Sequence, residues 1–232
     1  KVLEEHERDG MLQQARESVL AGGLRGSAEA GAVETLFGLL SDFSIEQAII
    51  EALNQQRVLR RVLADVPAAK RELRRLIGRV GTVDDILDEI SSGYTLTRDE
   101  HAQVFAIGGG GDFVDRLREV HPPHPEADAL LDAFLTGDRV PRKRLLLKTG
   151  MVALPEIAQK LVDEADRLSA LYQQLVAAEL ISRSEAMLDI VAAISTHYEN
   201  QKRARSLLDF DDLIEKLATL LTEESQGPWV RY

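Results

Sequence analysis

The sequence predicts an all-α protein. Only 5% of its 232 residues are aromatic, whereas β-sheets favour aromatic and β-branched side chains. No segment shows a convincing alternation of apolar and polar residues with the period of two that is typical of a strand. From Pro155 onward, apolar residues instead recur at the three- and four-residue spacings of an amphipathic helix. Together these observations indicate a chain that is built from helices.

The first part of the chain predicts five helices, most of them bounded by a residue that starts or stops a helix. Their expected ranges are 2–20, 30–40, 45–64, 67 to 78 or 81, and 83–90. Gly22 follows the first helix and helps to end it. Ser44 and Thr82 are expected as N-caps, because a hydroxyl oxygen accepts a hydrogen bond from a free amide of the first turn. Pro67 suits the first position of a helix.

The middle of the chain predicts short helices, and its last third predicts long ones. The expected ranges are 113–117, 126–135, 155–205 and 209–221. Four consecutive glycines at 108–111 predict a flexible connector. Ser182 and Glu185 have the spacing of a capping box, so the helix from Pro155 either restarts there or runs straight through.

The composition excludes several classes of site. The chain has no cysteine, which excludes disulfides, thiolate zinc sites and cysteine nucleophiles. Its 28 basic and 39 acidic residues give a net charge of −11, so no general affinity for nucleic acid or anionic membranes is expected. No apolar run reaches the ~20 residues that span a bilayer. We therefore expect a cytoplasmic protein without a membrane partner.

Two short strings resemble ligand sites but favour a simpler interpretation. Lys148-Thr149-Gly150 contains the Lys-Thr pair of a nucleotide-binding loop, but no glycine-rich turn precedes it. His121 and His124 have two prolines between them, and no third metal ligand is evident. We expect no catalytic residue and no metal site in this chain.

Basic residues gather in two places. Between positions 57 and 79 there are eight basic and two acidic residues, and Arg71, Arg74 and Arg75 are spaced to share one helical face. The second cluster contains Arg139, Arg142, Lys143, Arg144 and Lys148. Such clusters are typical of proteins that follow a phosphate backbone. The alternative is a solvated face that pairs with acidic neighbours.

The most distinctive string has the sequence Leu-Asp-Phe-Asp-Asp-Leu-Ile and runs from Leu208 to Ile214. Its three carboxylates suggest metal binding or acid–base chemistry. A simpler interpretation is that they cap a helix and complement its dipole. In that case Phe210, Leu213 and Ile214 form a buried edge.

The same string resembles the segment that UvrD/RecB-type superfamily 1 DNA helicases carry shortly before their Walker B motif. Tyr198 and Lys202 precede it as the family's Tyr and Lys do. Residues 228–232 are similar to the Trp-Val-x-Tyr of AddA subunits of bacterial double-strand-break-repair helicase–nucleases. Residues 135–148 resemble an AddA loop of the form Leu-Thr-x-Asp, Pro-Arg-Lys and Leu-x-x-Lys.

The resemblance implies an internal piece of an ATP-dependent DNA helicase that acts in recombinational repair. Residues 1–205 would be its helical 1B-type accessory domain, and residues 206–232 a returning segment of the first motor domain. The family's Walker A and Walker B motifs would flank this piece, so ATP and magnesium belong to the parent protein and the fragment alone should be inactive. The structural motif residues would be Asp209, Phe210, Asp211, Asp212 and Leu213.

The resemblance also implies the partners. These are duplex or forked DNA, contacted through its backbone, and a second helicase–nuclease subunit. The residues expected to contact DNA are Arg71, Arg74, Arg75, Arg142, Lys143 and Arg144.

Two other classes of function remain open. An all-helical protein–protein interaction module would turn its basic face to an acidic partner. A small hydrolase would use the carboxylates around Asp211, but it would need a pocket and a perturbed carboxyl pKa.

Overall fold

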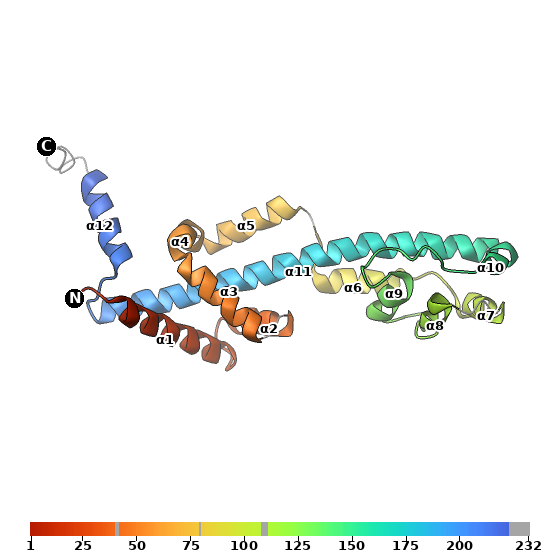
Figure 1. Cartoon of the computed structure of the whole chain (residues 1–232), viewed down its shortest axis with the longest axis horizontal. Coiled ribbons are helices and arrows are strands. Elements are labelled where there is room, and N and C mark those ends of the chain that lie inside the picture. The colour runs from red at the N-terminus through yellow and green to blue at the C-terminus, as the bar shows by residue number, and fades with distance from the viewer. Residues whose placement is uncertain (40–41, 79, 108–110, 223–232) are drawn as a thin grey trace. The chain divides into compact units, whose positions relative to one another are not determined.

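The protein is all-α, as the sequence predicts. The computed structural model describes residues 1–39, 42–78, 80–107 and 111–222, and this part of the chain contains helices and isolated bridges but no strand (Figure 1). The helices are α1 (Glu5–Gly23), α2 (Ala30–Leu39), α3 (Asp42–Asn54), α4 (Gln56–Ala64), α5 (Val66–Ile77), α6 (Val83–Ser92), α7 (Arg98–Ala106), α8 (Asp112–Leu117), α9 (Ala127–Phe134), α10 (Lys148–Ala153), α11 (Pro155–Ala204) and α12 (Phe210–Thr222).

The chain divides into two compact units. Unit 1 joins Lys1–Leu76 to Ser182–Tyr232, and unit 2 is Ile77–Ile181. The sequence analysis did not predict this division, because it placed residues 1–205 in one accessory domain. Each unit has its own hydrophobic core.

In unit 1, α1, α2 and α3 pack on the later part of α11. The core side chains are apolar residues at helical spacing, and the most buried include Ala15, Leu36, Ile45, Ile49, Ile190 and Ile194. Helices α1 and α2 approach so closely that a Cβ atom on Gly23 would lie 2.4 Å from Val33 Cγ2. A glycine at this position therefore permits the contact between the two helices.

The start of the chain is fixed to the segment before α12. Leu3 donates its backbone N–H to the Leu208 carbonyl at 2.7 Å, and Leu208 donates to the Lys1 carbonyl at 3.0 Å. These two bonds form an isolated parallel bridge between Val2 and Leu208. Residues far apart in the sequence are thus joined beside the acidic string.

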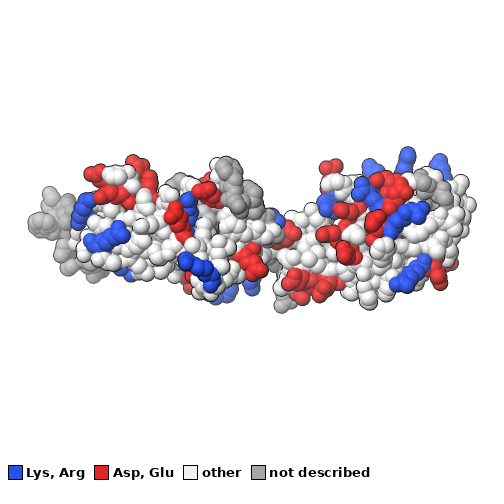
Figure 2. Space-filling model, turned by 90° about the horizontal axis from the view of Figure 1, so that it is seen from below, with Lys and Arg blue, Asp and Glu red and all other residues white. Residues whose placement is uncertain are grey.

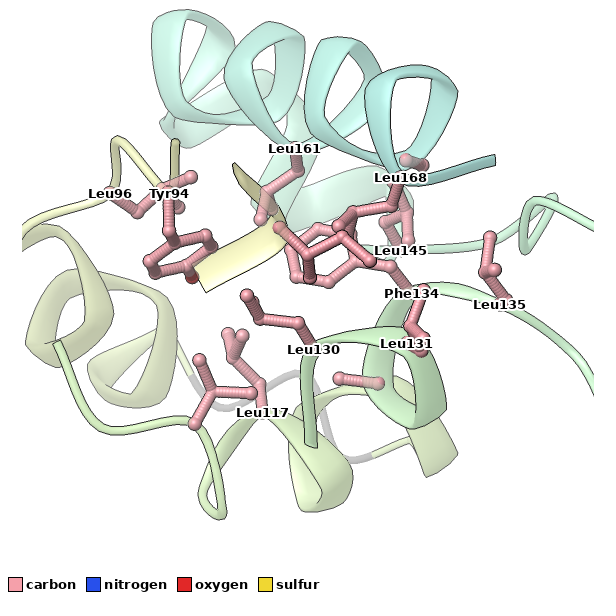
Figure 3. Packing of buried hydrophobic residues seen from close by; sticks show 14 of the residues in the cluster. Tyr94, Leu96, Leu117, Leu130, Leu131, Phe134, Leu135, Leu145, Leu161 and Leu168 are labelled. Atoms are coloured by element: carbon pink, nitrogen blue, oxygen red, sulfur yellow. The ribbon is translucent and has the colours of Figure 1, made fainter. Parts of the chain in front are cut away.

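In unit 2, α6 to α9 pack on the first part of α11. Figure 3 shows Leu161 and Leu168 of α11 pointing onto Phe134 of α9, and all three side chains are fully buried. Phe134 also packs edge-to-face with Phe113 at a centroid distance of 5.2 Å. Such aromatic pairs add about 0.5–1.5 kcal/mol to the effect of area burial.

The C-terminal end of α6 is held on α11 by one arginine. Arg167 donates to the Glu89 and Ile90 carbonyls, each at 3.0 Å. The buried carboxylate of Glu164 accepts two hydrogen bonds from the same guanidinium, at 2.6 and 2.9 Å. Carbonyls in the last turn of α6 thus accept hydrogen bonds from a side chain of α11; the Glu89 carbonyl also accepts the Gly93 amide at 3.0 Å.

Several predicted boundaries are confirmed. Thr82 caps α6 in a capping box with Asp85, and α5 begins beside Pro67. Helix α11 runs through Ser182 without a break for 50 residues, so of the two alternatives left open by the sequence, the uninterrupted helix is the one observed. The reason is local: no glycine or proline interrupts residues 156–204. Despite this length, neither α11 nor another described helix has the apolar stretch needed to cross a membrane.

Other boundaries differ from the prediction. Helix α3 already begins at Asp42, so Ser44 lies within its first turn and does not precede it. The predicted helix to residue 64 is divided into α3 and α4 at Gln55. The sequence analysis missed α7 and α10, which have nine and six residues. Residues 108–110, Arg79 and residues 223–232, with the Trp-Val-Arg-Tyr end, lie outside the described residues.

The apolar side of α12 is exposed, contrary to the predicted buried edge. Phe210 is 72% exposed, and the exposed fractions of Leu213 and Leu217 are 37% and 56%. The interactions at the start of α12 are polar, as described below. Within the described chain the helix is held at its acidic N-terminus and by an ion pair between Glu215 and Arg60 of α4 at 2.6 Å, and its apolar face is left largely uncovered.

Unit 2 has a buried histidine at its core. His101 is 4% exposed, and its Nε2 lies 2.6 Å from the Tyr94 hydroxyl. Burial lowers the pKa of His101 below its ordinary value of 6.5; Glu100 opposes this shift and His121 adds to it. The folded protein therefore favours the neutral imidazole.

We predict that unit 2 loses stability in weak acid because of His101. Above pH 6.5 the imidazole is neutral in both states, so its full contribution is present. As the pH falls from 6.5 towards the lower folded-state pKa, the unfolded chain binds a proton that the folded chain does not, and the free energy of unfolding decreases. Urea unfolding about one pH unit above and below 6.5 measures this loss.

The control is His101→Gln, which keeps a hydrogen-bonding group but does not titrate in this range. Its free energy of unfolding should change less between the two pH values. An equal change in both proteins would assign the pH dependence to other groups.

Candidate nucleic-acid interface

The second predicted basic cluster lies on a tight loop in unit 2. The loop leaves α9 at Phe134 and returns to it, since Arg142 donates its backbone N–H to the Phe134 carbonyl at 3.0 Å. Thr136 donates to the Val140 carbonyl at 2.8 Å, and Arg139 turns the chain with a φ of 57°. We call residues 139–148 the basic loop; it carries five basic residues and no acidic residue.

Arg142 is an anchor of this loop. Its side chain is only 16% exposed. Nη1 pairs with Asp112 at 2.5 Å, and Nη2 donates to the Asp132 carbonyl at 3.2 Å. Burial opposes ionisation of Asp112, but the hydrogen bonds and charges of Arg116 and Arg142 outweigh it and lower the pKa of Asp112. The guanidinium of Arg142 is thus engaged within the unit.

The neighbouring cations are available to a partner. Lys143, Arg144 and Lys148 are exposed. None of the three forms an ion pair with a side chain in the described ranges. Lys143 and Arg144 were predicted to contact DNA, and Lys148 was assigned from the sequence to the same cluster.

A cavity of about 410 Å³ opens beside these cations. Its lining combines the basic loop with apolar side chains of the loop, α10 and α11, namely Leu145, Leu146, Leu147, Met151, Ala158 and Val162. Leu147, Met151 and Val162 are 51%, 50% and 42% exposed. We call this the loop cavity; it presents apolar surface and positive charge together.

The first predicted basic cluster lies mainly on α4 and α5 of unit 1, and four of its six cations whose side chains are described form ion pairs. Arg74 donates to both carboxylate oxygens of Glu185 at 2.5 and 2.7 Å, and Arg75 donates to Glu72 at 2.6 and 2.8 Å. Arg71 is exposed and has no ion pair with any side chain described. On the face displayed in Figure 2, basic and acidic side chains are likewise interleaved.

The six residues predicted to contact DNA lie in two different units, three in each. They also differ in whether a carboxylate already holds them. Arg71, Lys143 and Arg144 are exposed and without an ion pair to a described side chain, whereas Arg74, Arg75 and Arg142 already hold carboxylates. Exposed ion pairs contribute little to stability, about 0–1 kcal/mol, but a phosphate would have to displace the glutamates to reach Arg74 and Arg75. The partners Glu185 and Asp112 are distant in sequence, and no sequence signal identifies them.

The acidic string forms a buried polar network with α11. Lys202 is 2% exposed, and its ammonium lies 2.9 Å from Asp209, 2.8 Å from Asp212 and 2.8 Å from Glu199. Asp209 also accepts a hydrogen bond from the Tyr198 hydroxyl at 2.9 Å. Four of the residues that carry the helicase resemblance, Tyr198, Lys202, Asp209 and Asp212, are thus joined in one hydrogen-bonded network.

The same carboxylates cap α12. Asp209 Oδ1 accepts from the Asp212 amide, and the Asp209 amide donates to Asp212 Oδ2, both at 2.9 Å. The predicted cap is therefore confirmed for Asp209 and Asp212. Burial opposes the charge of Asp209, but Lys202 and the other donors outweigh it and lower its pKa. For Lys202, burial is outweighed in the same way by its carboxylates, which raise its pKa.

The network around Lys202 has a structural role and is not arranged as a metal site. Glu199, Asp209 and Asp212 have the spacing of metal ligands, but the ammonium of Lys202 already satisfies all three carboxylates. The pKa of Tyr198 is raised by burial and by Asp209, so its hydroxyl stays protonated as a donor. The chemistry that this arrangement supports is charge pairing.

The other candidate sites from the sequence remain unsupported. His121 and His124 are both exposed. Lys148 and Thr149 begin the short helix α10 after a leucine-rich loop, which is unlike a glycine-rich phosphate loop.

Unit 1 also has an apolar groove of about 600 Å³, which is lined by side chains of α2 to α5 and of α11. Its lining includes Leu59, Leu73, Leu76 and Met187. Helix α5 has no fully buried residue, and Leu76 is 70% exposed. The sequence analysis missed this groove, because it recognised the basic face of α5 and did not test whether its apolar face is covered.

We predict that Lys202→Met destabilises unit 1 by about 3–5 kcal/mol, because it leaves three carboxylates close together without their cation. Urea unfolding followed by circular dichroism measures the change. Arg203→Met is the matched control: Arg203 is exposed, and its loss should change stability by less than about 0.5 kcal/mol. Similar effects of the two substitutions would contradict a structural role for the network.

Comparisons of the chain with protein-family models, curated proteins and solved structures give no match. Similarity to known proteins therefore does not show a family for this chain. The helicase resemblance of residues 135–148 and 198–232 remains a prediction. Substitutions of the site residues described above can test it.

Proposed function

We propose that this chain is a DNA-contacting accessory domain of an ATP-dependent DNA helicase, AddA-like, that acts in double-strand-break repair and recombination. The observation that carries the proposal is the basic loop. Within an acidic chain of net charge −11, it presents Lys143, Arg144 and Lys148 without an ion pair to any described side chain. Cations that are not neutralised within the protein are the ones that displace counterions from phosphates.

The network around Lys202 supports the proposal independently of the basic loop. Tyr198, Lys202 and the Leu-Asp-Phe-Asp-Asp-Leu string were matched to the helicase family as separate pieces of sequence. The side chains of Tyr198, Lys202, Asp209 and Asp212 meet in one hydrogen-bonded cluster, so these parts of the matched stretch are in contact in the fold. The exposed apolar side of α12 also suits a segment that returns to a motor domain, where it would be covered.

In the parent protein, ATP and magnesium would be held by motor-domain motifs that this chain does not contain. The chain's own contribution would be to position DNA through its backbone, which requires no sequence recognition. A partner helicase–nuclease subunit is part of the same proposal. We expect the isolated chain to hydrolyse no ATP.

We predict that replacing Lys143, Arg144 and Lys148 with alanine weakens binding to a forked DNA. Each lost phosphate contact reduces the slope of log K against log salt by about 0.9, so the slope should fall by about 2.7. Fluorescence anisotropy over a range of salt concentrations measures it. Arg71/Arg74/Arg75→Ala should reduce the slope by only about one, since two of these arginines hold glutamates.

The matched control is Arg25/Arg203/Arg205→Ala, which changes the net charge equally at exposed residues of unit 1. It should leave the slope unchanged. If this control weakens binding as much as the loop variant, the contact is nonspecific. If the α5 variant has the larger effect, the basic loop is not the main contact.

The apolar groove of unit 1 favours a second candidate function, an all-helical protein–protein interaction module. Arg61 and Arg71 are exposed on the helices that line the groove, without an ion pair to a described side chain. A half-covered apolar surface with positive charge nearby suits an acidic amphipathic helix. This function requires no affinity for DNA.

We predict for this second candidate that a designed helix with leucines on one face and glutamates on the other binds at least about tenfold more tightly than its lysine counterpart. Leu73→Asp should weaken the binding by about tenfold or more, because it places a charge in the groove. Isothermal titration calorimetry measures both differences. Equal affinity for the two peptides would contradict the claim that positive charge near the groove selects an acidic partner.

A further inference from the structure

The loop cavity combines positive charge with apolar surface, and the phosphates of a DNA backbone would contact only the positive charge. Lys143, Arg144 and Lys148 provide positive charge at its edge, and Met151 and Val162 provide half-exposed apolar surface inside it. At about 410 Å³ the cavity has the size of a small-ligand site, for which the usual range is ~300–1,000 Å³. Its occupant should therefore be anionic and partly apolar.

Duplex DNA matches only one of these features. Along a duplex, the groups within reach of a basic loop are mainly phosphates and sugars, and the faces of the bases are stacked inside. Apolar side chains beside the cations would stay in contact with water. A single strand, in contrast, exposes both its phosphates and the faces of its bases.

We propose that the loop cavity binds an unstacked nucleotide of a single DNA strand. The base lies against Met151 and Val162, and the adjacent phosphates lie at Lys143, Arg144 and Lys148. Arg142 acts as a positioning residue: its contacts with Asp112 and the Asp132 carbonyl hold the loop in place. This inference rests on the proposed function and specifies which part of a forked DNA the chain contacts.

The position of the cavity at the start of α11 supports a fixed site. Ala158 and Val162 belong to the first turns of α11, and Leu161 between them is fully buried in the core of unit 2. Leu145, next to Arg144, is also buried. The lining is thus attached on both sides to packed core residues, which limits the entropy lost when a ligand binds.

The test uses the whole chain and three oligonucleotides: an oligothymidylate of about 12 nucleotides, the same strand with abasic sites throughout, and a duplex of equal length. The first two have the same phosphates and differ only in their bases. We expect the oligothymidylate to bind about tenfold more tightly than the abasic strand, because a base against Met151 and Val162 removes apolar surface from water. Fluorescence anisotropy at one fixed salt concentration measures the ratio.

Two variants locate the contact. Met151→Gln should bring the affinity for the oligothymidylate close to that for the abasic strand, without changing the latter. Val152→Gln is the matched control, because Val152 is adjacent and 82% exposed but does not line the cavity; it should leave the ratio unchanged. Circular dichroism checks that both variants are folded.

The possible results separate this inference from the proposed function. Equal affinity for the thymidylate and abasic strands would overturn the inference and leave backbone binding intact. A preference for bases that Met151→Gln does not reduce would overturn the assignment to this cavity. Failure to bind any of the oligonucleotides would overturn the proposed function as well.

Discussion

The uninterrupted helix α11 is the constraint on which both units depend. Unit 2 packs α6 to α9 on residues 157–178, and unit 1 packs α1 to α3 on residues 186–198. A helix of 50 residues is stable in this setting because it contains no internal glycine or proline and because core side chains cover one side of it in each unit. The loop cavity and the Lys202 network both use side chains of this helix, one near its beginning and one near its end.

Charge pairing decides which surfaces can bind a polyanion. The chain is acidic, and many of its arginines and lysines are held by aspartates or glutamates of the same unit. An exposed pair of this kind adds little stability, but it lowers the local positive charge that a phosphate would meet. In the basic loop, Arg139 and Arg142 pair with Asp132 and Asp112, whereas Lys143, Arg144 and Lys148 are exposed and have no ion pair with a described side chain.

Much of the helical architecture could be predicted because its signals are local. Thr82 is an example: the hydroxyl, the following Asp85 and the apolar residues after it identify the start of α6 within a few positions. The short helices α7 and α10 were missed, since their sequences offer few apolar residues at helical spacing, unlike those of the equally short α8 and α9. Phe210 was expected inside, because periodicity shows which face of a helix is apolar but does not show what covers that face.

The sequence by itself determined the all-α class, the cap at Asp209 and Asp212, and the presence of two basic clusters. Each of these follows from neighbouring residues. Only the tertiary structure decided that Arg74 is paired and Arg144 is exposed, because the partner of Arg74, Glu185, is 111 positions away. It also brought Met151 and Val162 to the same cavity as the basic loop. Ion pairs and cavities depend on distances across the fold, and these distances are set by the packing of helices on α11.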